Sequence, residues 1–112
     1  MSEFCELIDL LEKFRDDREW SQFHDSKNLA LALSIEAAEL NELFLWKKDA
    51  QCEEVDKQRL KEELADVFAY ALMLAARHGL DVSQIVKDKI DLNAQKYPIE
   101  QSRGNSAKYK KP

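Results

Sequence analysis

Glycine and proline are scarce in this chain, since each occurs only twice in 112 residues. An all-β fold needs many turns, and turns rely on these two residues, so the composition argues against such a fold. No apolar run reaches the roughly 18 residues of a transmembrane helix, and the acid-rich start MSEFCELIDLLEKF is unlike a signal peptide. We therefore expect a cytoplasmic protein of one domain with no membrane partner.

Cysteine and histidine are equally scarce, with two of each. Cys5 and Cys52 have no metal-ligand spacing, and free thiols are the default for a cytoplasmic chain. Neither His24 nor His78 has a glutamate three residues before it, so the chain lacks the Glu-x-x-His signature of di-iron bundles. The net charge of -5 disfavours nucleic-acid binding through a broad basic surface, and we expect no such partner.

Apolar residues recur at helical spacing along most of the chain, which predicts an all-α fold, a bundle of four helices. The second and third helices are apolar on most faces, more than a lone small bundle can bury, so we expect them to lie at a subunit interface. Residues 1–98 are predicted to form the helical domain, and residues 99–112 a polar, basic tail. The predicted helices run from Ser2, as N-cap, to about Arg18, from about Asn28 to Trp46, from Asp56 or Lys57 to about His78, and from Asp81, as N-cap, to about Tyr97.

Four carboxylates stand in or beside the two apolar segments. Glu36 and Glu39 are the only charges in the run LALALSIEAAEL, and Asp66, three residues after Glu63, is the only charge in LADVFAYALMLAA. Residues three apart project from one face of a helix, so two antiparallel helices would bring all four carboxylates together. Such a group repels itself unless cations neutralise it, and its oxygens suit Mg²⁺ or Mn²⁺. This constellation points to metal-assisted attack of water on a phosphate ester or phosphoanhydride.

Acidic pairs on helices have a simpler explanation, because most of them lie on solvated surfaces. The chain would then be a helical adaptor without catalytic activity, whose acidic faces bind a basic partner. The apolar flanks of both pairs and their recurrence favour the metal site. Glu42, three residues after Glu39, and Glu62, four before Asp66, are within reach of that site, but we expect both to be exposed.

The fourth predicted helix carries a stripe of polar residues. Lys89, Asn93 and Lys96 fall on one face, with Tyr97 beside them. This stripe suits the binding of phosphate and sugar, but it equally suits a solvated face.

Aromatic residues gather near the start and the end of the second helix. Trp20, Phe23, His24 and Trp46 are able to stack on a base, or else to pack in the core or at an interface. Tyr70 follows Asp66 by four residues and would contact either a substrate or a carboxylate.

These residues resemble the MazG-like, all-α nucleoside triphosphate pyrophosphohydrolases, and most of all their single-domain dCTP pyrophosphatase branch. The resemblance rests on EAAEL followed by EELADVFAY, with REWSQFHDSKNLALAL, ELFLWK, KIDLNAQKYP and SRGNSAKY in support. It implies Mg²⁺-dependent hydrolysis of a (d)NTP to the monophosphate and pyrophosphate, which removes unwanted nucleotides from the pool. We expect dCTP as the first substrate and a homodimer or a homotetramer built from dimers. Whether water attacks the α- or the β-phosphorus is left open.

The resemblance also implies roles for individual residues. Glu36, Glu39, Glu63 and Asp66 would bind Mg²⁺, and we expect Glu36 or Glu39 to orient or deprotonate the attacking water. The positions of Trp20, His24, Trp46 and Tyr70 would line the nucleoside pocket, those of Lys89, Asn93, Lys96 and Tyr97 would lie near the phosphates and the sugar, and Arg103 would join from the tail or from a neighbouring subunit.

Overall fold

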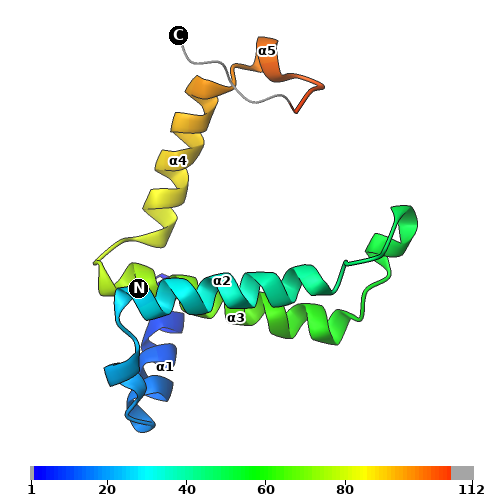
Figure 1. The fold of residues 1–112 in the computed structure, drawn as a ribbon. Coiled ribbons are helices and arrows are strands. Elements are labelled where there is room, and N and C mark those ends of the chain that lie inside the picture. The colour runs from blue at the N-terminus through cyan, green and yellow to red at the C-terminus, as the bar shows by residue number, and fades with distance from the viewer. Residues whose placement is uncertain (1, 107–112) are drawn as a thin grey trace. The chain divides into compact units, whose positions relative to one another are not determined.

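The computed structural model describes residues 2–106. All regular secondary structure in that range is helical, and none of it is a β-strand (Figure 1). The all-α prediction is therefore confirmed for the described residues. None of the helices in residues 2–106 combines the length and the apolar character needed to cross a membrane. The α-helices are α1 (Glu3–Asp17), α2 (Ser26–Glu42), α3 (Lys57–Arg77), α4 (Val82–Lys96) and the short α5 (Ile99–Ser102), and two 3₁₀ helices, η1 (Trp20–Phe23) and η2 (Asp49–Glu53), precede α2 and α3.

The chain divides into two compact units. The first unit ends at Leu80 and contains the helices from α1 to α3, whereas the second begins at Asp81 and contains α4 and α5. All four predicted metal ligands lie in the first unit. The geometry of the carboxylate site is therefore a property of that unit alone.

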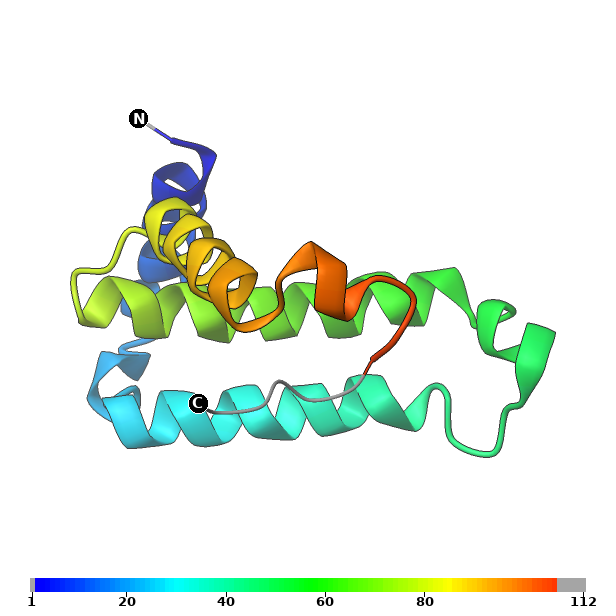
Figure 2. The same ribbon diagram turned by 90° about the horizontal axis from the view of Figure 1, so that it is seen from above.

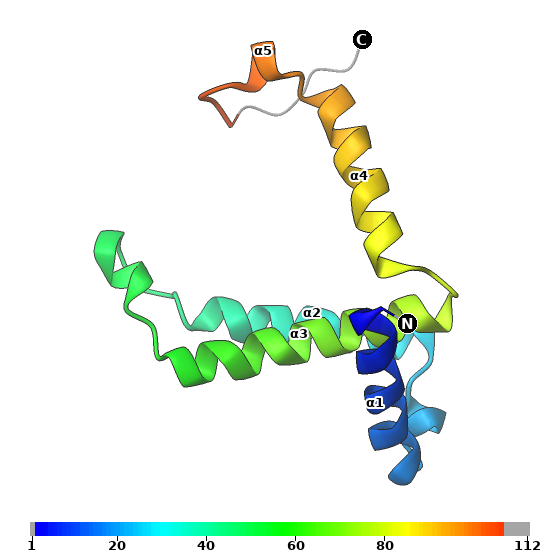
Figure 3. The same cartoon turned by 180° about the vertical axis from the view of Figure 1, so that it is seen from behind.

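Helices α2 and α3 lie side by side and antiparallel in the first unit (Figures 1 and 2). Helix α1 packs against α3 and against η1, and it crosses the α2–α3 pair rather than running along it (Figure 3). Among residues 2–106 the buried apolar core is small and consists of Leu29, Leu43, Leu72, Met73 and Ala75. These side chains hold α2 and α3 together and so fix the faces that carry the acidic residues.

The start and stop signals in the sequence mark the ends of α1, α3 and α4 to within one residue. Ser2 caps α1 by accepting a hydrogen bond from the Cys5 N–H at 3.2 Å. Asp81 caps α4 in the same way, with the Gln84 N–H at 3.1 Å. Gly79 follows α3 at a φ of 66°, a left-handed conformation that glycine adopts without strain.

The bounds of the second helix differ from the prediction at both ends. Helix α2 begins at Ser26 rather than at about Asn28, because Asp25 caps it by accepting from the Asn28 N–H at 2.8 Å. It ends at Glu42 rather than at Trp46. Trp46 has a φ of 69°, and an α-helix of L-residues does not continue through that conformation.

The predicted tail also contains regular structure. Ile99–Ser102 form one helical turn, in which the Gln101 N–H donates to the Pro98 carbonyl at 3.0 Å. Pro98 is the N-cap of this turn, where the N–H that proline lacks is not needed for a helical hydrogen bond. Residues 107–112 of the predicted tail lie outside the described range.

Large apolar side chains remain at the surface of α2 and α3. Leu31 is 56% exposed, Ile35 49% and Phe68 59%. Exposed apolar patches of this kind commonly mark protein–protein contacts. The exposure agrees with the expected subunit interface, although the number of subunits stays a prediction.

Replacing Asp25 with alanine removes the side-chain cap of α2 and should lower the free energy of unfolding by about 1 kcal/mol. The same substitution at Asp9, an exposed residue within α1, should change that free energy by less than about 0.5 kcal/mol. Urea unfolding followed by circular dichroism measures both values. An Asp25→Ala variant as stable as the wild type would show that the cap does not stabilise the start of α2.

Candidate active site

Three carboxylates from two helices meet in the first unit. Glu36 and Glu39 of α2 and Glu63 of α3 each offer an oxygen, and these oxygens all lie within 4.8 Å of one another. Asp66 lies one turn along α3 from Glu63 and stands outside that set, but its charge acts on both Glu36 and Glu63. The structure thus brings three of the four predicted ligands together and places the fourth beside them.

The cluster is electrostatically strained. Burial raises the pKa of Glu36 from 4.5 to about 7, and Glu39, Asp66 and Glu63 add to the increase. Burial also raises the pKa of Glu63, and the neighbouring Glu39 raises it further. One oxygen of Glu36 and one of Glu63, Oε2 in each case, are buried without a hydrogen-bond partner in residues 2–106. Unpartnered carboxylate oxygens facing a shared space are the donor set that a hard divalent cation takes.

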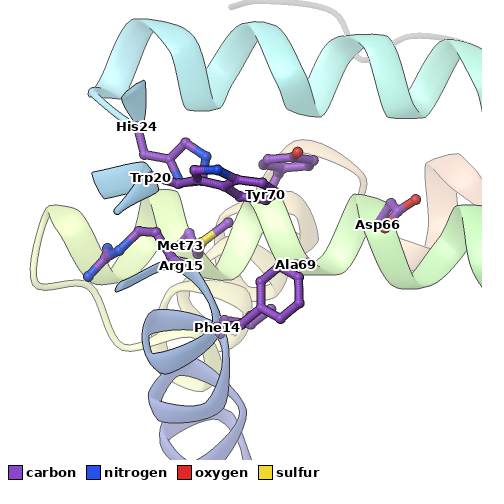
Figure 4. A pocket seen from close by; sticks show the side chains of 9 residues that line it. Phe14, Arg15, Trp20, His24, Asp66, Ala69, Tyr70 and Met73 are labelled. Carbon is purple, nitrogen blue, oxygen red and sulfur yellow. The ribbon is translucent and has the colours of Figure 1, made fainter. Parts of the chain in front are cut away.

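An aromatic cavity of about 260 Å³ adjoins this cluster. Trp20, His24 and Tyr70 line it, and so does Asp66, which is therefore part of both the cavity and the surroundings of the cluster. Figure 4 shows Trp20, His24 and Tyr70 close together, with Asp66 farther along α3. Burial, and then the charges of Glu36 and Asp66, raise the pKa of Tyr70 above 10, so its hydroxyl stays protonated and can donate.

His24 is held in place by two residues of α3. Its ring meets that of Tyr70 edge to face, with 6.3 Å between centroids, and its backbone carbonyl accepts from Arg77 Nη1 at 3.2 Å. Burial, and then the charge of Arg15, lower the pKa of His24 below 6.5, so the imidazole is neutral at pH 7. Its Nδ1 is buried without a partner in residues 2–106 and is available to a ligand.

Local contacts hold the η1 segment against α1. The guanidinium of Arg18 lies 3.6 Å from the centroid of the Phe14 ring and donates to the Phe14 carbonyl at 2.9 Å. Phe14 in turn meets Trp20 edge to face at 5.9 Å. These contacts position Trp20 at the cavity.

Some predicted residues do not join this group. Trp46 does not line the aromatic cavity and is 96% exposed, and Phe23 is 59% exposed. Glu42 and Glu62 lie outside the carboxylate cluster and are exposed, as predicted. Five further candidates belong to the second unit, where Lys89, Asn93 and Lys96 are exposed on α4, Tyr97 is its half-buried C-cap and Arg103 is exposed after α5.

The sequence prediction missed several residues of the cavity. Phe14 and Arg15 of α1 and Met73 of α3 line it together with the aromatic residues. The spacing of Phe14 indicated only that α1 has an apolar face, and the spacing of Met73 only that α3 is buried. Arg15 gave no signal, because a charged residue near a helix end is ordinarily solvated.

Comparisons with known proteins agree on one family. The MazG-like family matches residues 31–111. The dCTP pyrophosphatase 1 of Rattus norvegicus is 44% identical over 102 residues, and that of Homo sapiens 41%; each match covers 87% of this chain. The chain spans only 60% of the length of these curated relatives. A solved structure, a pyrophosphatase from Archaeoglobus fulgidus DSM 4304, matches with a TM-score of 0.81 and 39% identity over 88% of this chain and 94% of that chain.

Replacing Glu36 with glutamine should stabilise the metal-free protein at pH 8. The folded pKa of Glu36, about 7, exceeds its value of 4.5 without the surrounding fold, so this group stabilises the fold fully below pH 4.5 and loses that contribution as pH rises through 7. Glutamine removes the charge, and the Tm of Glu36→Gln should exceed that of the wild type at pH 8 but not at pH 4.

Thermal unfolding in EDTA measures this difference, and Glu42→Gln, a change of the same kind outside the cluster, is the control. Adding Mg²⁺ should raise the Tm of the wild type more than that of Glu36→Gln. A Glu36→Gln variant that is less stable than the wild type at pH 8 in EDTA would contradict the repulsion.

Proposed function

Because the chain belongs to the MazG-like family, we propose that it hydrolyses deoxynucleoside triphosphates to the monophosphate and pyrophosphate, with dCTP as the first substrate. One observation carries the proposal: a cluster of carboxylates adjoins an aromatic cavity, and Asp66 belongs to the surroundings of both. The cluster suits the triphosphate through a metal, and the cavity suits a base. The names of the relatives, dCTP pyrophosphatase 1 and a pyrophosphatase, support the same reaction.

Glu36, Glu39, Glu63 and Asp66 would hold Mg²⁺, for which Mn²⁺ is a substitute. A bound metal would neutralise the charge of the triphosphate and polarise the phosphorus that water attacks. The unpartnered oxygens of Glu36 and Glu63 support this assignment, since a bound cation would satisfy them. Carboxylates from only two packed helices also leave room for oxygens of water and substrate, as Mg²⁺ sites in proteins usually do.

Within this set, Glu36 or Glu39 would orient the attacking water and accept its proton. Both stand on α2 within one helical turn, so each can reach a water that lies between the cluster and the substrate. A carboxylate surrounded by other carboxylates holds a proton more readily than an isolated one, which favours this role near neutral pH. Both the α- and the β-phosphorus fit this scheme.

The base would lie in the aromatic cavity. The rings of Trp20, His24 and Tyr70 offer stacking faces and edges. Asp66 at the side of this cavity joins it to the cluster, so that the sugar would lie near Asp66 and the phosphates beyond it. The neutral His24 can either donate to or accept from a base.

The remaining predicted residues are proposed to act in an assembled enzyme. We assign phosphate and sugar contacts to Lys89, Asn93, Lys96, Tyr97 and Arg103, and a base contact to Trp46, on the strength of the family resemblance. Self-association into a homodimer or homotetramer is supported by the exposed apolar side chains of α2 and α3. The predicted domain of residues 1–98 holds all of these residues except Arg103. The proposed location is the cytoplasm, which agrees with Cys5 and Cys52 being free.

A helical adaptor with acidic faces explains the structure less well. Its acids would lie apart on solvated surfaces, where each is free to meet a basic partner. Instead, Glu36 and Glu63 are partly buried, and their oxygens converge with one from Glu39. The convergence is electrostatically unfavourable, and binding to a basic partner does not require it.

Product analysis with each dNTP and NTP should show a monophosphate and pyrophosphate as products, formed with Mg²⁺ and not with EDTA. Ion-exchange separation of the nucleotides, with a pyrophosphate assay, measures both products. Formation of a diphosphate and orthophosphate would instead indicate a phosphatase at the same metal site. No turnover of any nucleotide by folded protein that binds no Mg²⁺ would favour the adaptor.

Replacing Glu39 with glutamine or Asp66 with asparagine should lower kcat by about 100-fold or more, the scale on which one preorganised electrostatic group contributes to catalysis. The helical content should stay unchanged, since both side chains stand at the site and not in the core. Steady-state kinetics and circular dichroism measure the two effects, with Glu42→Gln as the control. Wild-type turnover in both variants would show that the carboxylate site is assigned wrongly.

A further inference from the structure

A second cavity, of about 280 Å³, lies next to the aromatic one. The two share Arg15, His24 and Met73 as lining residues, so these side chains form the wall between them. The second cavity is lined by polar groups, among them Glu12 and Arg77. The wall therefore separates the stacking surfaces of Trp20 and Tyr70 from a polar region that the proposed function leaves unused.

Arg15 is the basic residue that lines the aromatic cavity, and it stands at the end away from Asp66 (Figure 4). Its side chain is only 20% exposed. Nε donates to Asp16 at 2.9 Å and Nη2 lies 3.6 Å from Glu12, which leaves Nη1 without a partner in residues 2–106. The guanidinium is thus fixed by two acids and keeps one nitrogen for a ligand.

The acids beside Arg15 indicate the kind of ligand. Glu12 and Asp16 both pair with Arg15 and offset its charge, and His24 is neutral. A guanidinium already paired with two acids favours a phosphate less than a free one does, but its remaining donor suits an uncharged group that carries an acceptor atom. A nucleotide whose phosphates lie beyond Asp66 would place the far edge of its base at this end.

We propose that Arg15 determines base specificity by donating, through Nη1, to an acceptor on the far edge of the base, a carbonyl oxygen or an unprotonated ring nitrogen. His24 Nδ1, buried and unpartnered in the same wall, makes the second contact with that edge. The inference rests on the proposed function for the location of the phosphates. It goes beyond the proposed hydrolysis because it names a residue that discriminates between bases.

The test compares wild type, Arg15→Ala and Arg15→Lys, with Lys13→Ala as the matched control. Lys13 is on the same helix, 72% exposed and outside both cavities. Its loss removes one positive charge and an exposed ion pair with Asp17, and changes neither cavity. The readouts are kcat/KM for the four dNTPs, the Ki of inorganic tripolyphosphate, which has no base, and the Kd values of the four deoxynucleoside monophosphates by calorimetry in EDTA.

Arg15→Ala should lower kcat/KM for the best dNTP by about 10-fold or more, the loss expected for one hydrogen bond to a charged group. The spread of kcat/KM and of Kd among the four bases should narrow, while the Ki of tripolyphosphate should change by less than about twofold, since the phosphates do not reach Arg15. Arg15→Lys should recover only part of the preference, because a lysine lacks the planar fork.

An equal loss for all four dNTPs together with a raised Ki for tripolyphosphate would show that Arg15 is structural or binds phosphate, and would overturn the proposal. A ranking of the four bases that is the same in Arg15→Ala as in the wild type would overturn the proposal as well. If the wild type hydrolyses a dNTP in that case, the proposed function still stands. A wild type that turns over no dNTP but binds monophosphates with a base preference lost in Arg15→Ala would refute the reaction and support the role of Arg15. No turnover and no monophosphate binding would refute both.

Discussion

Glu36, Glu39 and Glu63 lie together in a partly buried position where their negative charges repel one another, and they stay there because α2 and α3 are packed by Leu29, Leu72 and Met73. A fold free of this constraint would turn the acids outward, where water screens them. The packing of two apolar helices thus maintains an arrangement that is unfavourable without a cation. This is the usual relation between a binding site and its scaffold, in which stability elsewhere offsets strain at the site.

The carboxylate cluster could be predicted from the sequence because helical spacing is a local rule. Glu36 and Glu39, and likewise Glu63 and Asp66, share a face of their helix whatever the rest of the chain does. Only the antiparallel pairing of the two helices had to be assumed, and the connection of residues 43–56 permits it. The offset of Asp66 from the other three could not be predicted, since it depends on the rotation of α3 against α2 and on side-chain packing.

The aromatic cavity was only partly predictable, for a related reason. Trp20 and His24 stand in a connector whose path depends on Glu19, at a φ of 56°, and on the contact of Arg18 with Phe14. Neither feature has a periodic signal. Arg15 was missed because its role comes from α1 crossing α3 at the level of Met73, a tertiary contact. The end of α2 was misplaced because the run ELFLW continues the apolar pattern past Glu42, whereas the backbone turns before Trp46.

The charge distribution of the first unit favours one orientation of a bound nucleotide. Acids concentrate at one side of the aromatic cavity, and at the other side the charge of Arg15 is offset by Glu12 and Asp16. A nucleoside triphosphate is divided in the same way, with all of its charge at the phosphates and none on the base. A cation among the acids would attract the phosphates there, and the reverse orientation would place them beside an arginine that two acids already neutralise. Orientation would thus be decided by electrostatics before any contact with the base, which leaves the base-facing residues free to discriminate between bases.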